Sequence, residues 1–234
     1  MKVLELGLYV IPAYAGMVLA EQGHKVTKWI GDKPDPIQTL EHGADLWIWA
    51  NEQKTIFKTS LDKIKSLQKG DFDLIIDNFR PYVWESLGIN PEKETERLDC
   101  TWVSMRDDMG DRSFDAVAQA RAWGDFIGYL PFYIGDTTGG LWLAFKALSE
   151  HAKGRSGHSI IYQATCLAKL VEGELRFPNL ARDSKQTPWD LPGSYGSTPN
   201  GVLVQYKNEI IEEPFRDQEW RRKNLKNNNG KFII

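Results

Sequence analysis

The sequence predicts an α/β fold with a doubly wound, mostly parallel sheet and a truncated second domain. The first observation is a strand, a helix and a second strand within the first 30 residues, which is the signature of a βαβ unit with parallel strands. The second is that short apolar runs continue to alternate with helical patterns as far as residue 171. The third is a change in composition after Glu174, where Pro, Gly, Ser and Asn become frequent. Such alternation is typical of a sheet with helices on both faces, in a Rossmann-like arrangement.

The elements of the first half follow from apolar runs and from residues that begin or end helices. Residues 3–8 are expected to form a buried strand, and the small and apolar residues of 12–22 a helix that Gly23 ends as a C-cap. Pro81 suits the first turn of a helix, where its missing N–H costs nothing. The other predicted strands are 25–30, 55–59, 73–77 and 101–105, and the other predicted helices are 61–68 and 91–98.

The second half contains one strong helical pattern, over residues 137–152. This segment is apolar on most faces, so we expect the helix to be buried. The other expected features are helix and loop between 107 and 133, a basic Gly-rich turn at 153–158, a strand at 159–162 leading into a helix that ends at Val171, a strand at 202–206 and a frayed terminus at 216–234. We therefore expect a Rossmann-like catalytic domain over residues 1–175, and a partial small domain with a flexible tail over 176–234.

Composition excludes several classes of protein. The 234 residues are 41% hydrophobic without a long apolar run, which argues against both a membrane span and a wholly disordered chain. The net charge is -3, whereas a nucleic-acid partner would require a basic excess. Cys100 and Cys166 stand apart, with no CxxC or Cys/His cluster, so we expect neither a disulfide nor a zinc site. The charged N-terminal stretch lacks a signal-peptide core, and a cytoplasmic protein is expected.

The sequence lacks the motifs that bind dinucleotides or ATP. No GxGxxG follows the first strand and no GxxxxGK[ST] occurs, which disfavours nicotinamide and ATP enzymes. The four histidines, His24, His42, His151 and His158, are far apart in sequence and belong to no catalytic motif. We interpret each as a surface or packing residue.

Asp136 is the most informative polar residue, because it stands at the entrance of the apolar helix. One interpretation is a helix N-cap, whose carboxylate accepts backbone N–H bonds and contributes about 1 kcal/mol. The other is catalytic. Gly139 and Gly140 remove bulk beside the carboxylate, and free N–H groups there could stabilise an oxyanion on a group attached to Asp136. A carboxylate so placed can act as a covalent nucleophile, and the residues alone leave both interpretations open.

Two further segments supply candidates for a ligand site. Asn78, Phe79 and Arg80 follow the strand at 73–77 at the carboxyl edge of the sheet, where open α/β folds bind their ligands. Arg80 could meet a phosphate while Phe79 stacks on a purine; alternatively, Arg80 could pair with Asp77 while Phe79 packs. Lys54, before the strand at 55–59, is either a further phosphate contact or a solvated lysine.

Several motifs occur in an order that is known from one family. They are Val-Leu-Glu-Leu6 with the small-residue helix from Pro12 to Ala20, Asn51-x-x-Lys54, Asn78-Phe-Arg-Pro81 with Leu87-Gly88, Phe114-Asp115 with Ala118-Gln-Ala120, and Gly135-Asp136 with Gly154-Arg-Ser-Gly157. This order and spacing resembles the class III CoA-transferase family, the group of formyl-CoA transferase, carnitine CoA-transferase and alpha-methylacyl-CoA racemase. The resemblance implies that Asp136 is catalytic.

The resemblance implies acyl-CoA chemistry, with coenzyme A as a substrate and no metal. In this family, the aspartate attacks a donor thioester to form an acyl-aspartyl anhydride, and the released CoA thiolate converts it to an aspartyl-CoA thioester. An acceptor carboxylate then takes CoA through a second anhydride. The implied neighbours of the nucleotide portion are Lys54, Asn78, Phe79 and Arg80, and those of the thiol are Tyr9, Val10 and Ala13. The implied partners are an acyl-CoA, a small carboxylic acid, and a second copy in a homodimer or a complementary subunit.

The chain also departs from the family. Family members are longer, and residues 192–206 resemble only the beginning of their small domain. Residues 106–111 replace a Gly-rich segment, and Phe114 stands where racemase members carry a histidine, which argues against racemisation. Two alternatives to the transferase therefore stay open: an inactive or split-subunit CoA-binding homologue, and a CoA-linked lyase, dehydratase or isomerase on the same scaffold.

Overall fold

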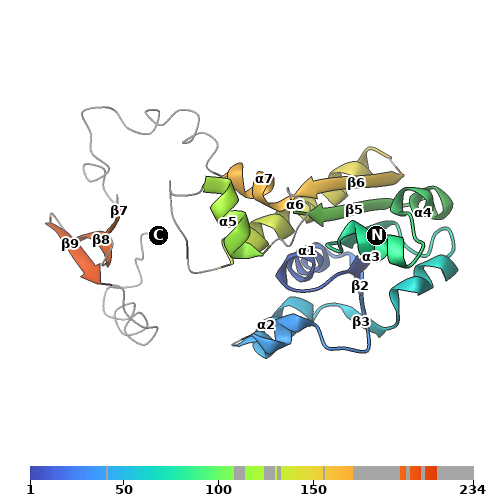
Figure 1. The fold of residues 1–234 in the computed structure, drawn as a ribbon, viewed down its shortest axis with the longest axis horizontal. Coiled ribbons are helices and arrows are strands. Elements are labelled where there is room, and N and C mark those ends of the chain that lie inside the picture. Colours follow the sequence, from blue (N-terminus) through green and yellow to red (C-terminus); the bar gives the residue numbers. More distant parts are fainter. Residues whose placement is uncertain are drawn as a thin grey trace. The chain divides into compact units, whose positions relative to one another are not determined.

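Six strands form one parallel sheet in the order β3-β2-β1-β4-β5-β6 (Figure 1). The strands are β1 (Lys2–Leu6), β2 (Lys25–Ile30), β3 (Thr55–Lys58), β4 (Leu74–Asp77), β5 (Thr101–Arg106) and β6 (Gly157–Tyr162). The strand order reverses between β1 and β4, so the loops that follow these two strands border the position where such sheets bind ligands. This arrangement confirms the predicted doubly wound, Rossmann-like α/β fold.

The structure, a computed structural model, describes residues 1–40, 42–107, 114–123, 130, 133–154 and 156–170, together with the backbone of three later strands. The chain divides into two units, residues 1–171 and 172–234. In the second unit, β7 (Gly196–Thr198), β8 (Gly201–Tyr206) and β9 (Glu209–Pro214) form an antiparallel sheet in the order β7-β8-β9. The expected frayed terminus at 216–234 lies outside the described residues.

One face of the parallel sheet is covered by α1 (Val10–Glu21) and α6 (Ile134–Ala152). Their apolar residues pack on alternate residues of the strands, among them Val3, Leu74 and Met105. The shorter helices α5 (Asp115–Trp123) and α7 (Gln163–Ala168) pack on each other through a smaller apolar cluster that includes Ala118 and Leu167. Within the described ranges, no helix combines the length and the apolar character that a membrane span requires.

The opposite face is covered by a 3-10 helix at Leu61–Ser66, by α3 (Pro81–Ser86) and by α4 (Pro91–Leu98). Local sequence explains α4: the Asn90 side chain accepts from the Lys93 N–H at 3.3 Å, and proline opens the first turn. The core on this face holds Trp84 and Trp102, whose rings meet edge to face at a centroid distance of 5.2 Å.

Three expectations about elements need correction. The long helix α6 is not buried on all sides. Leu141 and Phe145 lie one turn apart on the same face of the helix, and they are 48% and 62% exposed, respectively. The expected helix at 61–68 is a 3-10 helix, and the sequence analysis missed a 3-10 helix at Pro36–Thr39 and α2 (Gly43–Asn51). Little apolar periodicity marks the missed region, since α2 buries only Gly43, Ala50 and Asn51.

A buried ion cluster joins β1, β2 and α1. The Glu5 carboxylate accepts from Lys28 Nζ at 2.6 Å and from Lys54 Nζ at 2.7 Å, and all three side chains are completely buried. Burial alone would raise the pKa of Glu5, but the two ammonium groups hold this pKa below its ordinary value. Helix α1 comes this close because Gly16 has no side chain: a Cβ there would lie 1.9 Å from Glu5 Oε2 and 3.0 Å from Lys54 Nζ.

Gly16→Ala is therefore expected to destabilise the protein by about 3 kcal/mol or more, because the Glu5 carboxylate is held from two sides and cannot give way. The measurement is urea unfolding followed by tryptophan fluorescence. The matched control is Gly31→Ala, since a Cβ at Gly31 would meet nothing within 4 Å; its free energy of unfolding should change by less than about 1 kcal/mol. Equal stability of the two variants would contradict the packing described for Gly16.

Candidate active site

Asp136 lies at the carboxyl edge of the sheet. It is the third residue of α6, which connects β5 to β6 and so begins where the strands end. A Cβ at Gly139, one turn later, would lie 3.6 Å from Met105 Cε and 3.7 Å from Ile11 Cδ1, which places this turn beside the end of β5 and the start of α1. Asp136 itself is buried, with 8% of its surface exposed.

The helix α6 is capped by a residue from another helix. Asp115 Oδ1 accepts from the N–H groups of Gly135 at 2.6 Å and of Asp136 at 3.1 Å, while Asp115 Oδ2 accepts from Gln119 Nε2 at 2.6 Å. Gln119 is in turn held by both backbone groups of Leu130. The interpretation of Asp136 as the N-cap is therefore wrong. The helix is capped by Asp115, which precedes Gly135 by 20 residues, and the Asp136 carboxylate is not needed as a cap.

The Asp136 carboxylate has one hydrogen-bond donor among the described residues. Gln163 Nε2, at the start of α7, donates to Asp136 Oδ1 at 2.7 Å, and Oδ2 has no partner in the part of the chain described. Burial and the negative charge of Asp115 raise the pKa of Asp136 from 3.8 to about 7, although the Gln163 hydrogen bond acts in the opposite direction. A carboxyl group with such a pKa, at the positive end of a long helix, is typical of a functional site.

The expectation that Gly139 and Gly140 offer free N–H groups for an oxyanion is not supported. Only the first turn of a helix has unpaired N–H groups, and both glycines lie beyond the first turn of α6. Their small size serves packing instead. A Cβ at Gly140 would lie 2.9 Å from the Ile11 carbonyl and 3.0 Å from Tyr14 Cδ1, so this glycine allows α1 and α6 to approach closely.

The loops after β1 and β4 are tied together at the point where the strand order reverses. The Asn78 side chain accepts from the Leu8 N–H at 3.1 Å and donates to the Leu8 carbonyl at 2.8 Å. Gly7 makes this contact possible, because its φ is 137° and a Cβ there would lie 2.3 Å from Asn78 Oδ1. The predicted ligand residue Asn78 therefore holds a loop in this structure, and both of its polar groups are occupied.

Tyr9 links this loop to the Asp136 region. Its φ is 66°, which is uncommon for a residue other than glycine, and its N–H donates to Asp35 Oδ1 at 3.0 Å. Its ring meets that of Phe114 edge to face at a centroid distance of 5.8 Å, next to the capping residue Asp115. The other two residues predicted near a thiol, Val10 and Ala13, are buried in the first turn of α1.

Phe79 and Arg80 follow neither of the two expected patterns completely. Phe79 packs, as one alternative proposed, with its ring edge to face against Trp84 at 5.5 Å. Arg80, however, does not pair with Asp77. Its guanidinium lies over the Tyr82 ring at 4.9 Å, while Asp77 Oδ1 accepts from Arg106 Nη1 at 2.9 Å. Arg80 is therefore the one predicted phosphate contact whose charged group the described structure does not use in a hydrogen bond or ion pair.

Lys54 belongs to the buried ion cluster and not to a phosphate site in this structure. Its ammonium group donates to Glu5 Oε2, to the Ala13 carbonyl at 2.6 Å and to Asn51 Oδ1 at 3.0 Å. These three acceptors use all three N–H bonds and leave none for a ligand. Burial lowers the pKa of Lys54 to about 8, although Glu5 acts to raise it.

Sequence reasoning missed the residues that set the properties of Asp136. Gln163 has no distinguishing sequence pattern. Asp115 appeared only in a motif that also contains Gln119. Their spacing of four residues was the available signal that the two side chains share a hydrogen bond. Among the described residues, no group of His, Cys, Asp or Glu side chains is arranged to hold a metal ion. Asp136 itself is a largely buried carboxylate with a raised pKa.

Comparison with known proteins gives a likeness in structure only. No family model matches the chain, and no curated protein matches it. A hypothetical protein, Rv3272 from Mycobacterium tuberculosis, superposes with a TM-score of 0.68 at 21% identity, over 87% of this chain and 63% of that one. An aspartate-to-alanine variant of the same protein superposes with a TM-score of 0.67 at 18% identity, over 87% and 62%. The chain thus spans less than two thirds of these relatives, and the likeness establishes a shared α/β Rossmann-like fold.

Proposed function

We propose that the protein is an acyl-CoA transferase that moves CoA between carboxylic acids by covalent catalysis at Asp136. The observation that carries this proposal is the state of the carboxylate. Asp136 lies in the first turn of α6, but Asp115 caps this helix in its place. Asp136 Oδ2 has no partner among the described residues. A structural aspartate at a helix start would be expected to accept backbone N–H bonds, and here the N–H groups of Gly135 and Asp136 are already taken by Asp115.

The reaction balances without a redox step or a metal. Asp136 Oδ2 attacks the carbonyl carbon of the donor thioester, the C–S bond breaks, and CoA leaves as a thiolate. The thiolate attacks the aspartyl carbonyl of the mixed anhydride, the donor carboxylate leaves, and an aspartyl-CoA thioester remains. An acceptor carboxylate attacks this thioester and again releases the thiolate. Attack of the thiolate on the acceptor carbonyl finally yields the new acyl-CoA and restores the Asp136 carboxylate.

The described residues supply two of the conditions that this chemistry needs. Gln163 fixes one carboxylate oxygen and thereby orients the other. Partial desolvation makes the carboxylate more basic, and therefore a better nucleophile, while the pKa of about 7 keeps a large fraction ionised at neutral pH. The resemblance of the motif order to class III CoA-transferases adds support that is independent of this geometry.

The proposed place for CoA is the carboxyl edge between the loops that follow β1 and β4. This is where the strand order reverses, and the strained Tyr9 lies there beside Phe114. Arg80 is the proposed phosphate contact, in place of Lys54, whose donors are used. From the resemblance to the family, we further propose that a second copy or a complementary subunit contributes to the acceptor pocket.

The test is an exchange assay in which the protein is mixed with one acyl-CoA and a different carboxylic acid, and the new acyl-CoA is measured by liquid chromatography with mass detection. The proposal predicts exchange, with a rate that falls about tenfold per pH unit below the Asp136 pKa of about 7, because only the ionised carboxylate attacks. Loss or gain of water from the acyl chain without exchange would select the dehydratase alternative. Binding of CoA without turnover would select the inactive or split-subunit homologue.

A further inference from the structure

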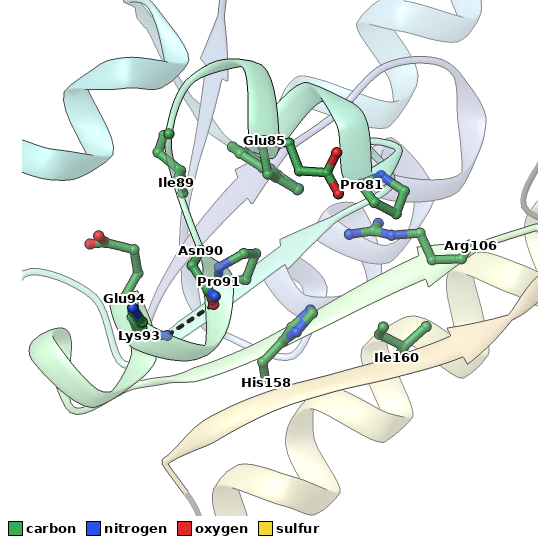
Figure 2. Close-up of a pocket in the computed structure, with 12 residues that line it drawn as sticks. Pro81, Glu85, Ile89, Asn90, Pro91, Lys93, Glu94, Arg106, His158 and Ile160 are labelled. Carbon is green, nitrogen blue, oxygen red and sulfur yellow. Dashed lines mark hydrogen bonds between the residues drawn. The ribbon is translucent and has the colours of Figure 1, made fainter.

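A cavity of about 570 Å³ lies between α3, α4 and the strands β5 and β6 (Figure 2). Arg106 and His158 project into it from the sheet, opposite Pro81 and Glu85 on α3. Strand residues alternate between the two faces, and Arg106 and His158 belong to the face that holds Trp102, whereas α6 and Asp136 cover the other face. The cavity is therefore separate from the candidate active site. Its volume is within the range of small-molecule sites.

Two side chains that line the cavity carry buried N–H groups without a hydrogen-bond partner. These groups are Arg106 Nε and Trp84 Nε1, and both side chains are at least nine-tenths buried. Buried polar groups are almost always paired, because an unpaired donor costs about 1–3 kcal/mol. Among the described residues that line this cavity, no buried side-chain acceptor is unpaired. The lining thus leaves two buried donors without an acceptor, which a ligand could bring.

The guanidinium of Arg106 is anchored on one side only. Nη1 donates to Asp77 Oδ1 at 2.9 Å and to the Met105 carbonyl at 3.0 Å. The opposite edge, formed by Nε and Nη2, makes no hydrogen bond to the described residues. This edge presents two parallel N–H bonds, the arrangement that binds both oxygens of a carboxylate.

His158 adds a neutral polar group to the same cavity. Ser104 Oγ donates to Asp77 Oδ2, and His158 Nε2 lies 2.8 Å from Ser104 Oγ. Because the hydroxyl proton is directed to Asp77, the histidine donates its Nε2–H to Ser104. Burial lowers the pKa of His158, although Asp77 acts to raise it, so the imidazole adds no charge at neutral pH.

We infer that this cavity binds a monocarboxylate with an apolar body, held side-on by Arg106. The charge of Arg106 is already shared with Asp77, and the two carboxylates Glu85 and Glu94 on the lining exceed the one further cation there, Lys93. This balance disfavours a doubly charged phosphate. The lining also has an apolar part, in which Ile89, Ile160 and two prolines are placed to contact an alkyl chain. This inference does not depend on the proposed transferase function.

The test uses hexanoate as the probe and the ring resonances of His158 in proton–carbon NMR spectra of the full chain as the readout. Hexanoate should shift these resonances in a saturable way. Hexanol, which has the same alkyl chain without the carboxylate, and inorganic phosphate should not. Equal shifts with hexanol, displacement of hexanoate by phosphate, or no response to hexanoate would each overturn the inference.

Two variants locate the site. Arg106→Lys keeps a cation for Asp77 but removes the Nε and Nη2 pair, and Ile160→Trp fills the cavity without changing charge; each should raise the dissociation constant of hexanoate about tenfold or more. Ile56→Trp is the matched control, because Ile56 is 40% exposed on the other edge strand and Ile160 is 45% exposed on β6. Asp136→Asn should bind hexanoate normally. Unchanged affinity in Ile160→Trp, or lost binding in Asp136→Asn, would contradict the assignment.

Discussion

Asp136→Asn is expected to reduce acyl-CoA exchange by at least about a thousandfold, because the amide cannot form the acyl-aspartyl anhydride that we propose as the intermediate. The variant changes little else. Asn has nearly the same shape, its Oδ1 still accepts from Gln163, and the cap provided by Asp115 remains. The measurement is the exchange rate at pH 8, where the native carboxylate is mostly ionised.

The matched control for this prediction is Asp45→Asn. Asp45 is also the third residue of a helix, in α2, but it is exposed and far in sequence from the proposed site. Its removal should leave the exchange rate within about twofold of the unmodified protein. If both variants retained full exchange, Asp136 would have no covalent role; if both lost it, the loss would not be specific to Asp136 and would contradict its assignment.

The same Asp136→Asn variant is expected to gain stability relative to the native protein as the pH rises. In the folded state the pKa of Asp136 is raised from 3.8 to about 7, so folding favours the protonated form. The native protein therefore loses stability as the pH rises from about 4 to about 7, and Asn, which cannot ionise, does not. Between pH 5 and pH 8, the difference in free energy of unfolding should change by about 3 kcal/mol in favour of the variant.

This change is measured by urea unfolding at several pH values within that range. Its pH dependence is more informative than its absolute size, because an amide left without an acceptor adds a constant that does not vary with pH. Asp45→Asn should show no comparable trend. A difference between Asp136→Asn and the native protein that stays constant from pH 5 to pH 8 would show that the Asp136 carboxyl has an ordinary pKa. A gain of stability with a loss of activity is the pattern expected of a catalytic group.

Much of the fold was predictable, because it depends on local patterns. The bounds of β2 and α4 agree with the predicted segments 25–30 and 91–98. Apolar runs fixed the positions of the strands, and their alternation with helices was sufficient to predict the parallel sheet. The helices between residues 36 and 51 were missed because their apolar residues do not repeat at helical spacing. This agrees with the structure, in which these helices bury few side chains.

The site was less predictable, because its chemistry depends on contacts between distant residues. The partner of Lys54 is Glu5, 49 residues away, and the partner of Asp77 is Arg106, 29 residues away, although Arg80 is closer in sequence. Whether Asp136 was a cap or a reactive carboxylate depended on Asp115, which no local rule connects to α6. The position of Asp136 at a helix start was local information, whereas its freedom from capping was not.

The most direct test of the proposed transferase function is a search for its covalent intermediate. The protein is mixed with a molar equivalent of acyl-CoA, quenched in acid, digested with trypsin and analysed by mass spectrometry. No Lys or Arg lies between residues 122 and 145, so one peptide, 122–146, contains Asp136. We predict that this peptide gains the mass of CoA or of the acyl group, that fragment ions place the gain on Asp136, and that hydroxylamine removes it. Exchange of CoA between acids while this peptide keeps its unmodified mass would contradict the account.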